Sequence, residues 1–186
     1  MASWWRKTVF TLPVGGLRIE FLASGLLAMG LTSALVASWV LAQGMPLANA
    51  IAIGLAAAGT HWLALLIHHF GHALAAARVG APMAGVRLWV WLGTSLYPAG
   101  ERNLSAAEHR QRAAGGPVAS LVLGTLGLSL AVLLSASSRW QWLAILLAAD
   151  SLLIFTLGAL IPLGFNDGST FLRYRPGGSR EGTSTD

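Results

Sequence analysis

The sequence contains no cysteine and few charged residues, and each shortage excludes a class of protein. Without cysteine, the 186-residue chain can form neither a disulfide nor a cysteine-ligated zinc site. Only 10% of its residues are charged, whereas soluble domains contain about a quarter, and 55% are hydrophobic. This composition excludes a soluble protein, and the length indicates a single membrane domain.

The basic residues indicate membrane topology rather than a nucleic-acid partner. The formal net charge is +5, but the lysines and arginines are scattered near the ends of apolar runs and form no continuous patch. We therefore expect membrane lipid, and no nucleic acid, among the partners of the chain.

Four apolar runs are long enough to cross a membrane as helices. They cover about 21–42, 48–78, 118–134 and 141–163. The first has no charged residue, and its 22 residues suffice to cross a bilayer at about 1.5 Å of helix rise per residue. We predict an all-α integral membrane protein with about four transmembrane helices, in a membrane domain that covers residues 21–170.

Shorter elements are predicted outside these spans. Trp4 and Trp5 are typical of interface anchors, so we expect residues 1–20 to form an interfacial segment without a removable signal peptide. Residues 83–98 begin with a run of strand formers and end with glycine and proline, which predicts a strand or hairpin at the membrane edge. Residues 105–112 are predicted to form a short polar helix, and the tail, 171–186, is predicted to be flexible.

The distribution of basic residues predicts the orientation. Four spans place the N-terminal segment, the loop between spans two and three, and the C-terminal tail on one side of the membrane. That side carries eleven of the lysines and arginines, and only Arg139 lies on the other. Such a bias is typical of the cytoplasmic side, so we predict cytoplasmic termini and location in a bacterial inner membrane.

His68 and His72 form the clearest candidate for a metal site. They are four residues apart at the end of the second span, so both imidazoles lie on one helix face and can bind one zinc ion. The spacing matches the H-E-x-x-H motif of zinc metalloproteases, with His69 at the position of the glutamate general base. A catalytic zinc ion needs a third protein ligand. Asp167 follows the fourth span, and the predicted topology places it at the membrane depth of His72.

Three motifs, in this order, resemble those of the site-2 proteases, intramembrane zinc metalloproteases with a three-helix catalytic core. The segment 68–72 resembles the family's zinc helix, 115–120 its G-P-x-x-N segment, and 162–168 its N-x-x-P…D-G segment. Together with the predicted strand region, the resemblance covers about residues 60–170.

The resemblance implies a set of residue roles. It implies one Zn²⁺ ion held by His68, His72 and Asp167. It places Pro117 and Ser120 in the segment that positions the substrate. The implied substrate is an extended transmembrane peptide.

The chain departs from the family pattern at three positions that matter for proteolysis. His69 replaces the glutamate, and Ser120 and Ala159 replace the two asparagines. The glutamate takes a proton from the attacking water and passes it to the leaving amine, and losing such a group typically costs about 10²–10⁴-fold in rate.

Two hypotheses follow, and whether the chain is an enzyme stays open between them. The first is an intramembrane zinc metallopeptidase that acts on or binds transmembrane segments, with proteolysis weak or lost. The alternative is a non-catalytic, zinc-stabilised membrane subunit or adaptor that binds transmembrane partners in a larger complex.

Three polar residues inside the spans have open roles. His69 can be a spare ligand, a substitute base or a hydrogen-bonding core residue. His61 lies two turns before His68 on nearly the same face, and can donate a hydrogen bond to a neighbouring helix, support the metal site or belong to a proton path. Asp150 lies within the fourth span, where a lone charge is costly, so we expect it to be protonated, paired with His61 or bound to a partner helix. An ion-handling role for these two residues is disfavoured by the absence of an internal repeat.

Overall fold

The computed structural model of the chain describes residues 3–134 and 138–176. Within them, four helical segments are long and apolar enough to cross a membrane. They are α1 (Ala23–Ala42), α2 (Leu47–Arg78), α3 (Ala106–Leu133), and α4 (Arg139–Ala149), which continues into the π-helix η2 (Asp150–Gly158). The predicted helical membrane architecture with about four spans is confirmed.

The smaller elements are more extensive than predicted. They are the 3₁₀-helix η1 (Trp4–Arg6), the strands β1 (Thr8–Val14), β2 (Leu17–Leu22), β3 (Gly85–Trp89) and β4 (Leu92–Leu96), and the short helix α5 (Asp167–Arg173). The strands form one sheet in the order β1-β2-β3-β4, with two antiparallel hairpins joined by a parallel β2–β3 pair. The hairpin predicted at the membrane edge is therefore half of a four-stranded sheet.

The N-terminal segment differs most from its prediction. Residues expected to be an irregular interfacial segment form β1 and most of β2, joined by a turn at Gly15 and Gly16, whose φ angles are +56° and +83°. The hairpin is stabilised by one face of β2, on which Leu17, Ile19 and Phe21 pack against the core. All seven residues of β1 remain exposed.

Two predicted helix boundaries also differ. The short polar helix and the third span are one continuous helix, α3, which runs through Pro117. Proline is tolerated in membrane helices where neighbouring groups satisfy the freed carbonyls. The fourth span ends at Gly158 rather than near 163. Residues 177–186 of the predicted tail lie outside the described residues, and α5 covers the start of that tail.

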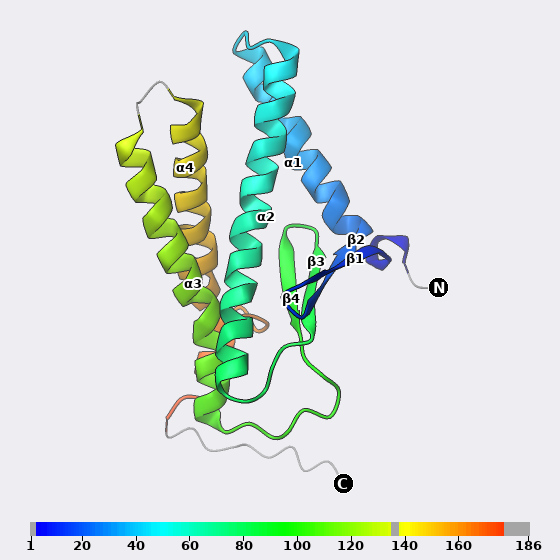
Figure 1. Cartoon of the computed structure of the whole chain (residues 1–186), viewed down its shortest axis with the longest axis vertical. Helices are drawn as coiled ribbons and strands as arrows, with labels where there is room; N and C mark the ends of the chain where they lie inside the picture. Colours follow the sequence, from blue (N-terminus) through cyan, green and yellow to red (C-terminus); the bar gives the residue numbers. More distant parts are fainter. Residues whose placement is uncertain (1–2, 135–137, 177–186) are drawn as a thin grey trace.

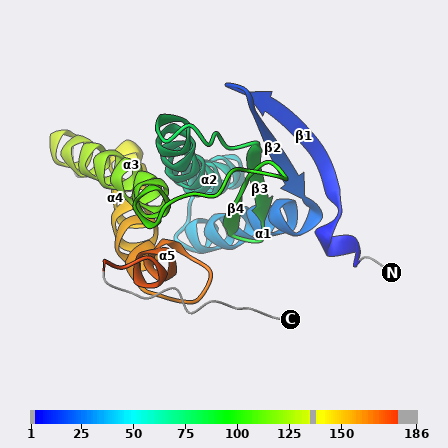
Figure 2. The same ribbon diagram turned by 90° about the horizontal axis from the view of Figure 1, so that it is seen from below.

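Helix α2 is the centre of the fold (Figures 1 and 2). It packs against α3 and α4 on one side and against α1 and β4 on the other. The outward faces of the spans carry large exposed apolar side chains, as lipid contact requires. They include Leu27, Leu31, Leu35, Leu55, Val118, Val122, Leu126 and Val132.

The crossing of α2 and α3 depends on two glycines. A Cβ atom on Gly71 would lie 2.2 Å from the carbonyl oxygen of Gly115, and a Cβ on Gly115 would lie 2.3 Å from that of Gly71. Small residues permit such close contact between membrane helices. Because Gly71 precedes His72 and Gly115 precedes Gly116, this crossing presses α3 against the histidines of α2.

Candidate metal centre

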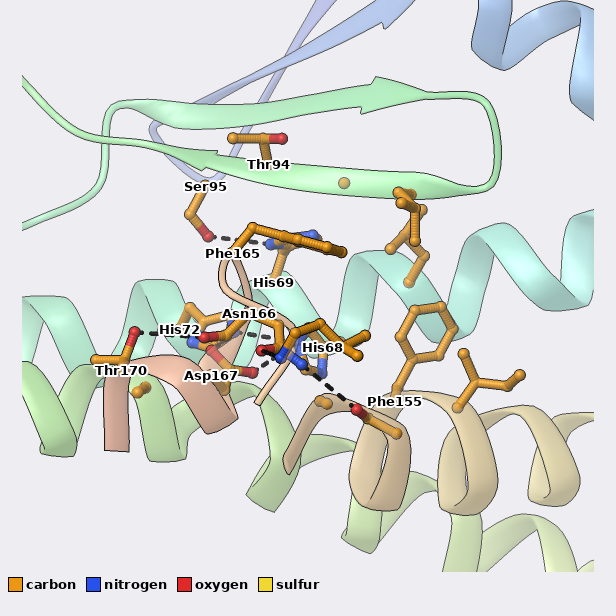
Figure 3. Close-up of a pocket in the computed structure, with 18 of the residues that line it drawn as sticks. His68, His69, His72, Thr94, Ser95, Phe155, Phe165, Asn166, Asp167 and Thr170 are labelled. Atoms are coloured by element: carbon orange, nitrogen blue, oxygen red, sulfur yellow. Dashed lines mark hydrogen bonds and ion pairs between the residues drawn. The ribbon is translucent and has the colours of Figure 1, made fainter. Parts of the chain in front are cut away.

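Three side chains converge beside the α2–α3 crossing (Figure 3). The Nε2 atoms of His68 and His72 are 3.1 Å apart, and the Asp167 carboxylate oxygens lie 3.4 Å from each of them. Two ligands of a tetrahedral zinc ion, with bonds of about 2.0–2.1 Å, are themselves about 3.3 Å apart. The spacing of the three groups fits one ion.

The loop before α5 holds the carboxylate in place. The side-chain oxygen of Asn166 caps α5, accepting hydrogen bonds from the Ser169 N–H at 3.3 Å and from the Leu163 N–H at 3.1 Å. Gly168 packs so closely that a Cβ there would lie 2.1 Å from the Leu160 carbonyl oxygen. These contacts fix the first turn of α5, to which Asp167 belongs.

In both histidines Nδ1 contacts a neighbouring group, and this leaves the lone pair of Nε2 free to bind a metal. His72 Nδ1 lies 2.8 Å from the Arg112 carbonyl oxygen, which can only accept, and 3.3 Å from the Gly116 N–H, which can only donate. The shorter contact places the proton on Nδ1 and leaves Nε2 its lone pair. His68 Nδ1 lies 3.0 Å from Ser120 Oγ, which allows the same tautomer. Such outer hydrogen bonds are typical of metal-binding histidines.

The resulting arrangement calls for a cation. With protons on both Nδ1 atoms, two nitrogen lone pairs and one carboxylate face a common point, and a positive ion there relieves their repulsion. Gly116 leaves that point free, because a Cβ on it would lie 2.3 Å from His72 Nε2 and 2.6 Å from His68 Nε2. The donor set of two imidazoles and one carboxylate fits Zn²⁺.

The side chains of His68, His72 and Asp167, here called the metal group, border a cavity of about 800 Å³. One wall is β4, the opposite wall is η2 with the loop to Asp167, and the histidines of α2 lie between them (Figure 3). The lining is largely apolar, and Asp167 is its only carboxylate among the described residues. The candidate metal position therefore adjoins a largely apolar cavity.

His69 faces β4 rather than the metal group. Its Nδ1 lies 3.0 Å from Ser95 Oγ, and its ring packs on Gly93, where a Cβ would lie 2.1 Å from Nε2. Of its three open roles, this geometry favours the hydrogen-bonding residue over a spare ligand. The metal position is consequently left open towards the cavity.

The residues of the middle motif lie behind the metal group. Ser120 is fully buried and contacts His68, and Pro117 is also buried; neither lines the cavity. The position of Ser120 favours orientation of His68, while substrate positioning by Pro117 and Ser120 stays a prediction. His61 and Asp150, whose roles the sequence left open, form a pair at 2.9 Å.

Acidification is expected to release a bound metal ion, because it protonates the histidine ligands. Burial alone would raise the pKa of Asp167, but hydrogen bonds and charge interactions with His68 and His72 outweigh it and lower the pKa to about 2. Imidazoles, with an ordinary pKa of about 6.5, bind metals only when neutral. We therefore expect zinc affinity to weaken progressively as the pH falls below about 6.5, measured by competition with a chelator at each pH. A zinc affinity that does not change on acidification would contradict histidine ligation.

Comparisons with known proteins found a match in fold and none in sequence. No protein-family model and no curated protein matches the sequence. The structure is similar to that of the site-2 protease from Methanocaldococcus jannaschii, with a TM-score of 0.61 and 15% identity, over 88% of this chain and 69% of that chain. At this identity the similarity concerns the fold. The chain therefore has a site-2 protease-like fold, as the order of its three motifs predicted.

Proposed function

We propose that this chain is a membrane-embedded zinc protein of site-2 protease type that binds an extended peptide segment beside the metal, with peptide hydrolysis weak or lost. The observation that carries the proposal is the buried His68–His72–Asp167 group, which faces an apolar cavity. A bound zinc ion would polarise a peptide carbonyl and lower the pKa of its water to about 7.

The shape of the cavity supports a peptide as its occupant. Among the described strands, β4 lies at the edge of the sheet, and its residues Leu92 to Ser95 line the cavity. An edge strand offers free main-chain N–H and C=O groups to an added strand. An unwound transmembrane segment supplies both the apolar side chains and the main-chain groups that this wall can bind.

The positions of His69 and Asp167 support weak rather than efficient hydrolysis. His69 occupies the position of the general base but is directed to Ser95, and Asp167 is committed to the metal group. Proton transfer from the attacking water therefore has no carboxylate acceptor besides Asp167 in the cavity lining that the structure describes. Zinc would still bind and orient a peptide.

A non-catalytic adaptor is the second candidate, and the same orientation of His69 favours it. In that case zinc would stabilise the fold, and the cavity would hold a transmembrane partner within a larger complex. Both candidates keep the proposed orientation, with cytoplasmic termini and a bacterial inner membrane as the location, on the evidence of the basic residues.

Metal analysis of the purified protein tests the proposal. In detergent, the unmodified chain is expected to hold one zinc ion, measured by mass spectrometry of metals. His72→Ala and Asp167→Ala are expected to lose it, because two ligands rarely hold zinc alone. His109→Ala is the matched control, since His109 lines the same cavity but lies outside the metal group. An unmodified chain without zinc, or equal zinc in all variants, would overturn the proposed site.

A further inference from the structure

The turn of the β3–β4 hairpin is tied to three helical segments. Trp91 Nε1 donates a hydrogen bond to Thr32 Oγ1 on α1 at 2.9 Å. The Trp91 carbonyl lies 3.1 Å from Nε2 of His61 on α2. His61 Nδ1 lies 2.9 Å from Oδ2 of Asp150, the first residue of η2. We call Thr32, His61 and Asp150 the turn clamp; none of them belongs to the metal group.

The protonation of the pair follows from its partners. Because the Trp91 carbonyl can only accept, His61 Nε2 carries a proton. A second proton lies between His61 Nδ1 and the Asp150 carboxylate, so the pair is net neutral whichever atom holds it. A neutral pair with its hydrogen bonds made is a tolerable arrangement for polar groups within a membrane span.

The clamped turn is conformationally unfavourable by itself. Val90 has a φ angle of +49° and is the single non-glycine residue with positive φ among those described. Two-residue hairpin turns with this geometry favour glycine, and β-branched residues disfavour it. The surrounding contacts must therefore hold the turn, and removing them allows it to relax.

The clamp connects the two walls of the cavity. The turn leads directly into β4, whose Gly93 and Ser95 contact His69 and line the cavity. Asp150 begins η2, which forms the opposite wall. His61 lies seven residues, or about 10 Å of helix, from His68, so the walls are joined on the side of the cavity away from α5.

We propose that His61 and Asp150 are positioning residues that hold the β4 wall of the cavity relative to η2 and so set the space available to a bound peptide. The part of this inference that concerns peptide rests on the proposed function, whereas the clamp itself does not. The clamp acts through hydrogen bonds, so a neutral side chain able to hydrogen-bond can replace Asp150.

Hydrogen exchange measured by mass spectrometry tests the clamp. His61→Phe and Asp150→Leu are expected to speed exchange of amides in residues 85–97 about tenfold or more, with little change in α3 and α4. Thr32→Val should give a smaller increase. Asp150→Asn should stay near the unmodified rate, because its amide can donate to neutral His61. Unchanged exchange in the first two variants, or an equal rise throughout the helices, would overturn the clamp.

Matched controls distinguish the effect of the clamp from a general effect on the sheet. They also distinguish a failure of the clamp from a failure of the proposed function. Glu20→Gln removes an exposed ion pair with Arg87, at 2.8 Å on the same sheet, and should leave the turn unchanged. His61→Phe should keep its zinc but bind a labelled apolar transmembrane peptide about tenfold more weakly. Faster exchange with unchanged affinity would overturn the role in peptide binding. If the unmodified chain binds no peptide, the proposed function fails, while the exchange result still decides the clamp.

Discussion

Replacing His69 with glutamate is expected to raise zinc-dependent cleavage of transmembrane peptides by about 10²–10⁴-fold. The position lies beside the metal group: the His69 ring centroid is 5.4 Å from that of His68 and 5.8 Å from that of His72. A carboxylate there can take a proton from the attacking water and deliver it to the leaving amine, which the imidazole bound to Ser95 is not placed to do. Cleavage of a panel of transmembrane peptides, followed by mass spectrometry, measures the gain.

Two variants control this experiment. His69→Gln has the shape of glutamate without a proton acceptor, so it should show no gain. His69→Glu combined with His72→Ala should lose cleavage together with zinc. Equal cleavage by the unmodified chain and His69→Glu would contradict the assigned loss of the base. A His69→Glu protein that binds zinc and peptide without cleaving would favour the adaptor over the weakened peptidase.

Gly116→Ala is expected to lower zinc affinity at least about 100-fold. The new methyl group would lie 2.3 Å from His72 Nε2 and 2.6 Å from His68 Nε2, in the space that the metal would occupy. Competition with a zinc chelator of known affinity measures the change. The substitution adds one carbon atom and keeps all three candidate ligands in the sequence, so a loss of zinc would show that the ion binds beside Gly116.

The control for this substitution is Gly59→Ala. Gly59 lies on α2, and a Cβ there would meet no atom within 4 Å, so zinc affinity should stay unchanged. The thermal unfolding of each metal-free protein shows whether Gly116→Ala has altered the fold itself. Full zinc binding by a folded Gly116→Ala protein would place the ion elsewhere and contradict the proposed centre.

The elements whose structure depends on the local sequence pattern were predictable from the sequence. Apolar runs without charges predict membrane helices, because a span must satisfy its main-chain groups internally. The spacing of His68 and His72 predicts their common face, because 3.6 residues make one helical turn. Asp167 was singled out because it follows a span that ends at the depth of the histidines. The structure brings these three side chains together.

The sheet was only partly predictable, because half of it depends on distant pairing. Its parallel pair joins β2 to β3, with Ile19 opposite Val86. The strand formers of 86–92 gave a local signal, whereas the short segment before α1 carries turn residues and no clear alternation. Its strands are stabilised by the neighbour they meet in the folded chain, which no local pattern reveals.

The sequence by itself determined the membrane spans, the histidine spacing and the missing glutamate. Only the tertiary structure decided which atoms those residues meet. The Arg112 carbonyl that fixes the tautomer of His72 and the Trp91 carbonyl that binds His61 are main-chain groups, present at every residue and therefore without a sequence signature. Likewise, His69 is directed away from His68, His72 and Asp167 by its contact with Ser95, on a strand 26 residues further along the chain. Composition and periodicity encode what each segment buries, whereas packing selects the partner of each donor and acceptor.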